Sequence, residues 1–319
     1  MHFHPREQRA FPEKVSWPFR INSLRVSLTN KCNYDCFFCH NEGESKEGHR
    51  QVDKFSSALI NLVKAGVELW IRKITLTWWE PFLRKDILLI IDQISELSKD
   101  VLIWVTSNGF LLTKNKIASI SGKVRKLNLN FQSASELTFK EITGVDWLRK
   151  ITSIIPLLQE AGIHVTLNFV FTSKNSNEID YVLKYAQIHW CDLKILELVQ
   201  AFAQPNELPK QDFHQEVQRL SLQYWWGQSF QISPSETIIY YDTIQGKRKW
   251  RFISSYCNTF DSNACSTHGE LRVSDRFELK HCIMPNSWGL NVYHQAISWD
   301  IESIKVSLMK VNELLWVCP

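Results

Sequence analysis

Three cysteines, Cys32, Cys36 and Cys39, stand within eight residues directly behind a short apolar run, Leu24–Leu28. Thiolates at this spacing are typical metal ligands, but three of them cannot fill a four-coordinate site. If they hold an iron–sulfur cluster, one iron stays open to a ligand that is not protein, and chemistry can take place there. Two alternatives remain open: a structural zinc site with a fourth ligand such as His40, or three unrelated thiols.

The composition is that of an ordinary globular protein, with 319 residues, 44% hydrophobic and 22% charged. The net charge of +4 is too small to indicate a nucleic-acid partner, although it permits an anionic substrate. The first residues do not resemble a secretory signal, and we find no apolar run of about 18 residues that would span a membrane. We therefore expect a cytoplasmic protein without a membrane partner. Its eight cysteines should form no disulfides and should serve as metal ligands, except for the lone thiols Cys191 and Cys318.

Strand and helix signals alternate between residues 23 and 204, after an N-terminal arm of residues 1–22. The predicted strands are rich in β-branched residues: Leu24–Leu28, Lys73–Thr77, Val101–Thr106, Lys126–Phe131, His164–Phe171 and Leu193–Val199. The predicted helices are amphipathic: Lys54–Ala65, Arg84–Ser98, Lys114–Ile120, Trp147–Ala161 and Glu178–Gln187. Gly66 and Gly162 follow two of these helices, where glycines often end a helix. The pattern predicts an α/β fold, a partial (β/α)6 TIM-like barrel with its ligands at the carboxyl ends of the strands.

Residues 205–319 show a different pattern, which predicts a C-terminal α+β region that closes the open barrel. Pro205–Pro209 has the composition of a linker, and Phe213–Tyr224 has that of a helix. Thr237–Tyr241 and Lys249–Ile253 are predicted to form a hairpin. Three more cysteines follow: Cys257, Cys265 and Cys282.

A second motif ends the second predicted strand, where Ile74–Asp86 reads ITLTWWEPFLRKD. Together with the cysteines it resembles the radical S-adenosylmethionine superfamily. In that family three cysteines hold a [4Fe–4S] cluster, and S-adenosylmethionine chelates the fourth iron. The family's segment reads TGGEPLLRKD, and its glycine backbone and glutamate region receive the methionine amino group. The resemblance therefore implies both cofactors, with Cys32, Cys36 and Cys39 as the catalytic metal ligands.

Two further segments match the family at the ends of strands. Val105–Leu112 resembles the family's TTNGxLL, whose polar groups face the cofactor, although a plain Asn-Gly turn is the alternative. Asn130–Ser133 stands where the family has SLDS, and Gln132 lacks the negative charge of that aspartate. The resemblance assigns these positions to the cofactor: Phe38, Trp78, Trp79, Glu80, Thr106, Asn108, Asn130 and Val199.

Two tryptophans, Trp78 and Trp79, replace the two glycines of the family's segment, and their indoles would fill the volume that the cofactor needs. Three explanations compete: loss of activity in evolution, an engineered blockade, or a gene translated with the wrong code. Some genetic codes read UGA as tryptophan and others as glycine. The chain has 13 tryptophans and only 11 glycines, and Trp17, Trp70 and Trp190 also stand where glycine would suit. Our hypothesis is that Trp78 and Trp79 stand for glycines.

The matches over about residues 20 to 200 are closest to one branch of the family, the GTP 3′,8-cyclases of molybdenum-cofactor biosynthesis. The arginine that matches Arg25 contacts the nucleotide in that branch, which suits a guanidinium, although a salt bridge at a strand end is the alternative. Asn168 and Glu197 match polar positions on the fifth and sixth strands. Arg272 is what remains of a pair of arginines. These four residues are the predicted substrate contacts.

The C-terminal cysteines test this assignment, because the branch holds a second [4Fe–4S] cluster there with the spacing Cx2Cx13C. The spacing from Cys257 through Cys265 to Cys282 is wider, although Cys282 is in register with the family. We expect an auxiliary cluster, and a zinc site with His268 or His281 is the alternative.

The resemblance implies an enzyme that receives one electron, from a donor such as flavodoxin or ferredoxin, and cleaves S-adenosylmethionine to a 5′-deoxyadenosyl radical. The leading prediction is a cyclase-like enzyme with a small-molecule substrate, a nucleotide. One alternative is a relative that modifies a peptide or another small molecule. A second alternative is a non-catalytic iron–sulfur protein whose cofactor site is blocked by Trp78 and Trp79.

Overall fold

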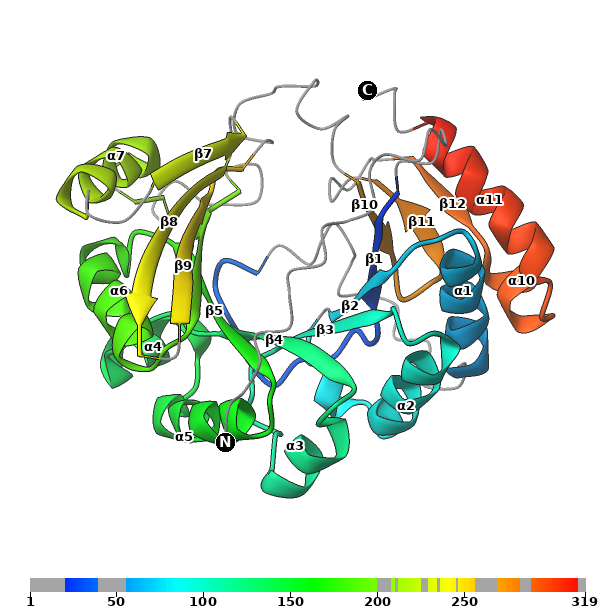
Figure 1. Ribbon diagram of the computed structural model, residues 1–319, viewed down its shortest axis with the longest axis horizontal. Helices are drawn as coiled ribbons and strands as arrows, with labels where there is room; N and C mark the ends of the chain where they lie inside the picture. The colour runs from blue at the N-terminus through cyan, green and yellow to red at the C-terminus, as the bar shows by residue number, and fades with distance from the viewer. Residues whose placement is uncertain are drawn as a thin grey trace.

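The computed structural model describes residues 21–39, 56–77, 79–199, 208–209, 212–224, 229–233, 236–244, 246–255, 269–281 and 288–314. Their strands form a single twelve-stranded sheet in the order β12-β11-β10-β1-β2-β3-β4-β5-β6-β9-β8-β7. The sheet bends into an open arc with helices along its outer side (Figure 1). The predicted α/β fold with a partial barrel is confirmed.

Six parallel strands form the middle of the arc. They are β1 (Ser23–Ser27), β2 (Lys73–Thr77), β3 (Leu102–Ser107), β4 (Val124–Asn130), β5 (His164–Phe171) and β6 (Asp192–Glu197). The helices between them are α1 (Ser56–Glu68), α2 (Ile87–Leu97), α3 (Lys114–Ile120), α4 (Glu136–Thr143), α5 (Leu148–Glu160) and α6 (Ile179–Ile188), with short 3₁₀ turns η3 (Pro81–Leu83) and η4 (Ser176–Glu178). All six predicted strands are present within a few residues.

The C-terminal part of the chain adds strands to both ends of this sheet. After α7 (Phe213–Gln223), the antiparallel strands β7 (Ser229–Ser233), β8 (Glu236–Thr243) and β9 (Gly246–Ile253) extend it beyond β6. Strands β10 (Glu270–Val273), β11 (Glu278–Lys280) and β12 (Gly289–Asn291) extend it beyond β1, and α10 (Tyr293–Ile297) and α11 (Ile301–Leu314) pack against α1. Within the described residues these strands lengthen the arc, and its end strands β12 and β7 are not paired with each other. Closure of the barrel by residues 205–319 stays a prediction. The domain division at residue 205 stays a prediction.

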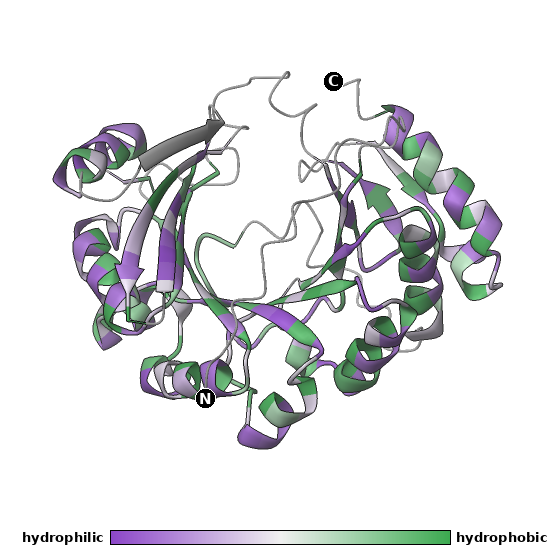
Figure 2. Ribbon diagram, in the orientation of Figure 1, coloured by the Kyte–Doolittle hydropathy of each residue, from purple (hydrophilic) through white to green (hydrophobic). Residues whose placement is uncertain are grey.

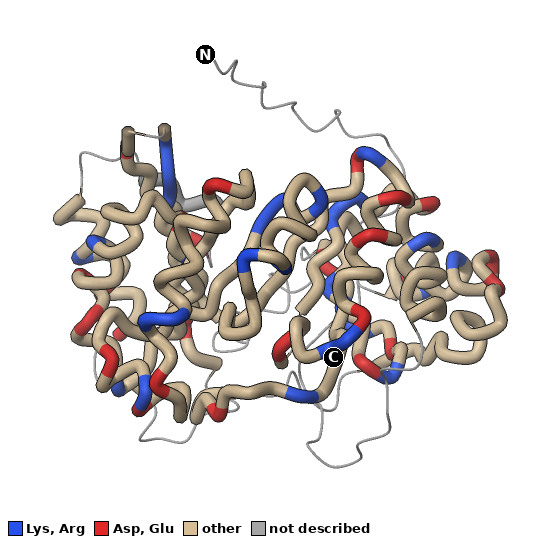
Figure 3. The backbone as a smooth tube through the Cα atoms, turned by 90° about the horizontal axis from the view of Figure 1, so that it is seen from below, with Lys and Arg blue, Asp and Glu red and all other residues tan. Residues whose placement is uncertain are grey.

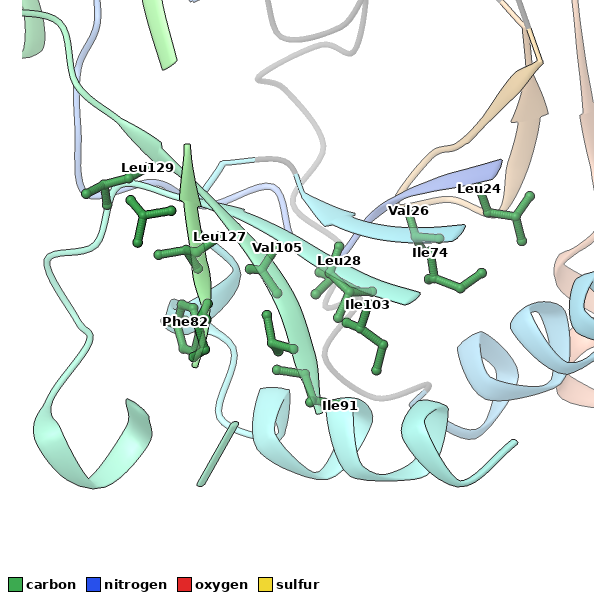
Figure 4. Close-up of a cluster of buried hydrophobic side chains, with 14 of the residues drawn as sticks. Leu24, Val26, Leu28, Ile74, Phe82, Ile91, Ile103, Val105, Leu127 and Leu129 are labelled. Atoms are coloured by element: carbon green, nitrogen blue, oxygen red, sulfur yellow. The ribbon is translucent and has the colours of Figure 1, made fainter. Parts of the chain in front are cut away.

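The two faces of the strands differ because side chains alternate along a strand. On β1 and β2, Leu24, Val26, Ile74 and Leu76 are buried, and the same face of the sheet meets the helices (Figure 4). The alternate positions are polar, as at Arg25 and at the equivalent positions of the neighbouring strands. Each outer helix mixes hydrophobic and hydrophilic residues along its length (Figure 2). The apolar core therefore lies between sheet and helices, and the inner face of the arc is left for polar groups.

The ends of the helices correct one prediction and confirm another. Gly162 follows α5 with a φ of 76°, as expected of a helix-ending glycine. Gly66, in contrast, lies inside α1, where a Cβ would come within 2.8 Å of Leu24 Cδ1. It is therefore a close-packing position, and the left-handed residue after α1 is Trp70, with a φ of 67°.

Acidic and basic residues are both spread over the described helices, so no helical face shows one sign of charge (Figure 3). No helix in the described part of the chain has the length and apolarity to cross a membrane.

Candidate functional site

The cysteine loop is held against α4, a helix that the sequence patterns did not predict. The Asp35 and Phe37 backbone N–H groups donate to the carbonyls of Thr143, at 2.9 Å, and Ile142, at 3.3 Å. Gly144 then turns the chain away in the left-handed conformation, and a Cβ at this position would lie only 3.3 Å from Asp35 Cβ. The end of α4 thus fixes the loop that carries the thiols.

The sulfur atoms of this loop are offered amide donors. The Tyr34 backbone N–H donates to Cys32 Sγ at 3.3 Å, and Asn108 Nδ2 lies 4.0 Å from the same sulfur. Asn130 Nδ2 lies 4.0 Å from Cys36 Sγ. Such donors lower the energy of a negatively charged sulfur, which is the form that binds iron.

Burial opposes the charged form of these thiols when no metal is present. It raises the pKa of Cys32 to about 11, and the neighbouring charges of Glu80 and Cys39 add to the rise. Burial also raises the pKa of Cys36 well above its ordinary range, with smaller contributions from Cys39 and Cys32. Since bound iron would offset three gathered negative charges, the donor set fits a metal cluster better than three independent thiols.

The described residues contain no set of three or more His, Cys, Asp or Glu side chains placed around a single metal ion. A [4Fe–4S] cluster takes one thiolate at each iron, so its ligands sit at different corners of a cube and not around one ion. His40, the fourth ligand of the zinc alternative, lies outside the described residues.

Glu80 connects the second motif to the third. Its carboxylate is fully buried and accepts the Asn108 backbone N–H at 2.7 Å, the Phe82 backbone N–H at 3.0 Å and the Ser107 hydroxyl at 2.9 Å. Burial raises the pKa of Glu80 to about 7, although these hydrogen bonds favour the charged form. The Glu80 backbone N–H donates to the Lys31 carbonyl at 3.0 Å. Glu80 therefore ties the ends of β2 and β3 to the cysteine loop.

Trp79 precedes Glu80 with a φ of 51°, a left-handed conformation that glycine adopts far more readily than tryptophan. Its side chain is partly buried. Trp78 lies outside the described residues.

The polar residues at the ends of β3, β4 and β5 are brought together as predicted. The Thr106 hydroxyl accepts from Asn128 Nδ2 at 3.4 Å, and Asn130 accepts a hydrogen bond from Gln132 Nε2. Gln132 itself is buried, and its side-chain oxygen accepts the Val170 backbone N–H at 3.0 Å. Gln132 is thus used for structure, at the position where the family has a charged aspartate.

Three buried acceptors on the inner face have no hydrogen-bond partner within the described structure: Thr75 Oγ1, Thr166 Oγ1 and Asn168 Oδ1. A buried polar atom without a partner is costly, so these atoms point to a polar ligand inside the arc. Asn168 is the one of them that the sequence predicted as a substrate contact.

The other predicted substrate residues have definite partners. Arg25 Nε donates to Glu270 Oε1 at 2.7 Å, and Arg272 lies 3.9 Å from the same oxygen. Arg25 therefore forms the salt bridge of the alternative, and its contact with a nucleotide stays a prediction. Glu197 accepts the Ser255 backbone N–H at 2.8 Å, which joins the end of β6 to the end of β9. Val199 and Phe38 are partly buried beside the same end of the sheet.

Arg25 and Arg272 belong to a larger group of basic residues that line the inner face, one from each of six strands, and the sequence analysis missed the other four. We call this group the basic interior: Arg25, Lys73, Lys126, Lys194, Arg251 and Arg272. Four strands lie between β1, which carries Arg25, and β6, which carries Lys194, yet the charges of these two residues interact. They therefore face each other across the arc. For Lys194 the signal was in the sequence, because this lysine stands between the apolar residues Leu193 and Ile195 of β6.

Burial in this basic interior lowers the pKa of Lys194 to about 7 and that of Lys126 to about 8. For Lys194 the nearby charges of Arg25 and Arg251 add to the effect. Three carboxylates counter part of this charge. Glu236 accepts from Arg251 Nε at 2.5 Å, and the charge of Asp192 acts on Lys126. Arg25, Arg272 and Lys73 hold the pKa of the third, Glu270, far below the ordinary range despite its burial. The interior thus carries excess positive charge.

Cys257, Cys265 and Cys282 lie outside the described residues, so the auxiliary cluster stays a prediction. Of the histidines in the zinc alternative, His268 is likewise outside, and His281 follows β11 with its Nε2 buried and without a partner among the described residues.

The sequence of the chain was compared with known families and curated proteins. The model of the radical SAM superfamily matches residues 26–186, about half of the chain. A probable GTP 3′,8-cyclase of Sulfurisphaera tokodaii is 39% identical over 169 residues, which are 52% of each chain. A protein of the same name from Metallosphaera sedula is 34% identical over 186 residues, 56% of each chain. The chain thus spans about half the length of these curated relatives.

Solved structures resemble the fold at low sequence identity. SuiB of Streptococcus suis bound to S-adenosylmethionine has a TM-score of 0.65 and 14% identity over 88% of this chain and 65% of that one. The enzyme anSMEcpe with bound AdoMet has a TM-score of 0.60 and 14% identity over 91% of this chain and 83% of that one. The cysteine loop, the partial barrel and the matching family model agree. The chain belongs to the radical SAM superfamily of enzymes, which use a [4Fe–4S] cluster and S-adenosylmethionine.

Proposed function

We propose that this protein is a radical SAM enzyme whose substrate is a nucleoside triphosphate, and that it catalyses the 3′,8-cyclisation of GTP. The relatives named probable GTP 3′,8-cyclase, at 39% and 34% identity, support the reaction. Because they match only about half of their length, the substrate must be argued from the site itself.

The observation that carries the proposal is the basic interior. Six basic side chains line the inner face of the arc, and the carboxylates of Glu270, Glu236 and Asp192 counter only part of their charge. Thr75, Thr166 and Asn168 also offer unpartnered polar atoms there. A triphosphate brings several negative charges and many acceptor oxygens, which guanidinium and ammonium groups bind with charge-assisted hydrogen bonds. An uncharged peptide would leave most of this positive charge uncompensated.

The lowered lysine pKa values suit the same ligand. In the empty interior Lys194 and Lys126 lose part of their positive charge at neutral pH, because burial and neighbouring cations disfavour it. An anion placed among them would restore the charged form, since an opposite charge nearby raises a lysine pKa. Binding of a triphosphate is therefore coupled to uptake of protons.

Residues at the carboxyl ends of the strands position the reacting part of the substrate. When bound, the cluster and S-adenosylmethionine supply a 5′-deoxyadenosyl radical, which takes a hydrogen atom from the substrate. The Cys32 to Cys39 loop holds the cluster, and Asn108 and Asn130 support its sulfur atoms. The single electron would come from a partner such as ferredoxin or flavodoxin. The basic interior would hold the phosphates, and the sugar and base would then lie toward the carboxyl ends of the strands, where the cysteine loop would hold the cluster.

The proposal is tested by measuring the binding of GTP, GDP and GMP to the anaerobically reconstituted protein by calorimetry. We expect affinity to fall in that order, and Lys194→Met and Arg251→Met each to weaken GTP binding about tenfold, the loss of one charge-assisted contact. Lys184→Met, at an exposed position on α6, is the matched control and should bind GTP like the unaltered protein. Equal affinity for GTP and GMP, unchanged by both interior substitutions, would refute a triphosphate substrate.

The two alternative functions, a peptide-modifying relative and a non-catalytic iron–sulfur protein, predict different results. A peptide-modifying relative would bind the three nucleotides equally weakly. In a separate assay with S-adenosylmethionine, a non-catalytic protein with a blocked cofactor site would neither bind nor cleave this cofactor, whatever nucleotide is present.

A further inference from the structure

The backbone conformation separates the tryptophans of this protein into two kinds. Five residues other than glycine have a left-handed φ among those described, and four of them are tryptophan: Trp70 at 67°, Trp79 at 51°, Trp190 at 52° and Trp299 at 62°. In this conformation the Cβ of an L-residue crowds the following carbonyl, so bulky residues avoid it, while glycine adopts it at no steric cost. Four large aromatic residues at such positions require an explanation.

Trp70 occupies the place after α1 that glycine normally takes in a helix C-terminal motif. The Ile71 backbone N–H donates to the Gly66 carbonyl at 3.0 Å, and the Trp70 N–H donates to the Val67 carbonyl at 3.0 Å. These are the two hydrogen bonds of the Schellman motif, in which the left-handed residue is most often glycine.

Trp190 forms the same motif after α6. The Cys191 backbone N–H donates to the Ala186 carbonyl at 2.9 Å, and the Trp190 N–H donates to the Gln187 carbonyl at 3.3 Å. Trp299, after α10, has the longer bond of the motif, from the Asp300 N–H to the Gln295 carbonyl at 3.0 Å.

Glycine occupies the equivalent place after other helices that pack on the same sheet. After α5, the Ile163 backbone N–H donates to the Leu158 carbonyl and the Gly162 N–H donates to the Gln159 carbonyl, both at 2.9 Å. Gly122 and Gly144 are the left-handed residues after α3 and α4, with φ of 75° and 76°. Wherever a described helix ends in a left-handed residue, that residue is therefore glycine or tryptophan.

Two of the three indoles at these helix ends, those of Trp70 and Trp299, contribute little packing, whereas Trp190 is partly buried. Trp70 is 80% exposed and Trp299 is 67% exposed. The Trp70 ring has the Arg72 guanidinium 4.8 Å from its centre, a contact at the surface. At Trp70 and Trp299, burial therefore offers no gain that would offset the unfavourable backbone conformation.

Other tryptophans are used in the ordinary way. Trp250 on β9 is 2% exposed and packs against Tyr241, and Trp147 stacks on Phe110 with ring centres 3.6 Å apart. Trp104 lies within β3, where Lys73 and Lys126 approach its ring within 4.3 and 4.8 Å. Glycine at any of these three places would leave a cavity or lose a strand residue.

We propose that positions 70, 79, 190 and 299 are glycine in the protein as its own cells make it, encoded by UGA codons that those cells translate as glycine. Trp104, Trp147 and Trp250 are then genuine tryptophans, encoded by UGG. At position 79 the change bears on the cofactor site, since the left-handed turn there sets the Glu80 N–H against the Lys31 carbonyl, and glycine keeps this turn without an indole beside the cysteine loop. The codon at position 78 decides in the same way the hypothesis, made from the sequence, that Trp78 stands for glycine.

The direct experiment reads the codons in the gene and the peptide masses of the protein isolated from its own organism. We expect UGA at positions 70, 79, 190 and 299, UGG at positions 104, 147 and 250, and peptide masses that correspond to glycine at the first four. UGG codons and tryptophan masses at the first four positions would overturn the proposal. Neither result depends on the substrate, so it is separate from the test of GTP binding.

A second experiment compares two forms of the purified protein by thermal unfolding. The variant with glycine at positions 70, 79, 190 and 299 should have a higher Tm than the protein with tryptophan there, by about 2 °C or more per site, because strain is removed. Trp250→Gly is the control and should lower Tm sharply, because it empties a buried site. A fall in Tm for the fourfold variant would contradict the proposal. Binding of S-adenosylmethionine, measured separately, should tighten at least tenfold when positions 78 and 79 are both glycine.

Discussion

The carboxylate of Glu80 accepts the backbone N–H of Asn108 at 2.7 Å, which joins the end of strand β2 to the end of strand β3. Asn108 in turn donates to Asn33 Oδ1 at 2.7 Å and approaches Cys32 Sγ. One buried charge thus connects the three motifs that were read separately in the sequence. The cysteine loop, the segment with the two tryptophans and the Asn-Gly turn form a single structural unit.

Glu80→Ala tests this unit. The substitution leaves two backbone N–H groups and the Ser107 hydroxyl without their acceptor, so the free energy of unfolding should fall by about 3 kcal/mol in urea denaturation. The reconstituted variant should also release iron to a chelator faster. Glu160→Ala, at an exposed position on α5, is the control and should change neither quantity. If both variants unfold and release iron alike, Glu80 has no such role.

Cys36→Ala tests the first cluster. The variant should lose the iron and the visible absorbance of one [4Fe–4S] cluster, about four irons per chain, and with them all cleavage of S-adenosylmethionine. Cys191→Ala removes a buried cysteine elsewhere in the fold and should keep the iron content. Retention of the full iron content by Cys36→Ala would show that the assignment of its thiol is wrong.

The auxiliary cluster is tested by joint replacement of Cys257, Cys265 and Cys282 with alanine. We expect the anaerobically reconstituted protein to bind about eight irons and the triple variant about four, with cleavage of S-adenosylmethionine preserved. Zinc in the unaltered protein that disappears from the triple variant would favour the zinc alternative with His268 or His281. An unchanged metal content would exclude both sites.

Lys194→Met tests how far the buried positive charge of the basic interior lowers the stability of the folded protein. Since the pKa of Lys194 is lowered to about 7, the unfolded chain binds more protons than the folded one between about pH 7 and 10.5, and the stability of the empty protein rises with pH over that range. The variant should lack this contribution and should be more stable than the unaltered protein at pH 7, by ~2 kcal/mol. Parallel stability curves for the two proteins from pH 6 to 10 would show that Lys194 is not strained. The same variant should bind GTP more weakly, so stability and function oppose each other here.

The strands and most helices could be predicted from the sequence because their apolar residues recur with clear periods. Helix α4 was missed, since Glu136–Thr143 is short and is recognised mainly by its Ser135 cap, whose hydroxyl faces the Thr138 N–H. Gly66 was misjudged because sequence alone does not distinguish a glycine that ends a helix from one that lets Leu24 pack closely. The first error concerns a short helix with a weak sequence pattern, and the second concerns a contact between distant parts of the fold.

The site could be predicted only where a family motif marked it. Cys32, Glu80 and Asn108 were found in this way, although the internal use of the Glu80 carboxylate was not. Of the basic interior, only Arg25 and Arg272 were marked by a family motif. Lys194 and Arg251 escaped because they are far from Arg25 in the sequence and meet it only when the sheet curves. The left-handed conformation of Trp299 could not be read from the sequence either, since no motif surrounds it.

The central claim is that a nucleoside triphosphate in the basic interior is the substrate of the radical chemistry at Cys32, Cys36 and Cys39. The most direct measurement is the formation of 5′-deoxyadenosine by the reconstituted protein with a strong reductant and S-adenosylmethionine, in the presence of GTP or of GMP. It should be made on both forms, with tryptophan or glycine at positions 78 and 79. In whichever form binds the cofactor, GTP should increase 5′-deoxyadenosine formation at least tenfold over GMP and should itself be consumed in equal amount. Equal 5′-deoxyadenosine formation with GTP, with GMP and without nucleotide, and with GTP recovered unchanged, would contradict the account.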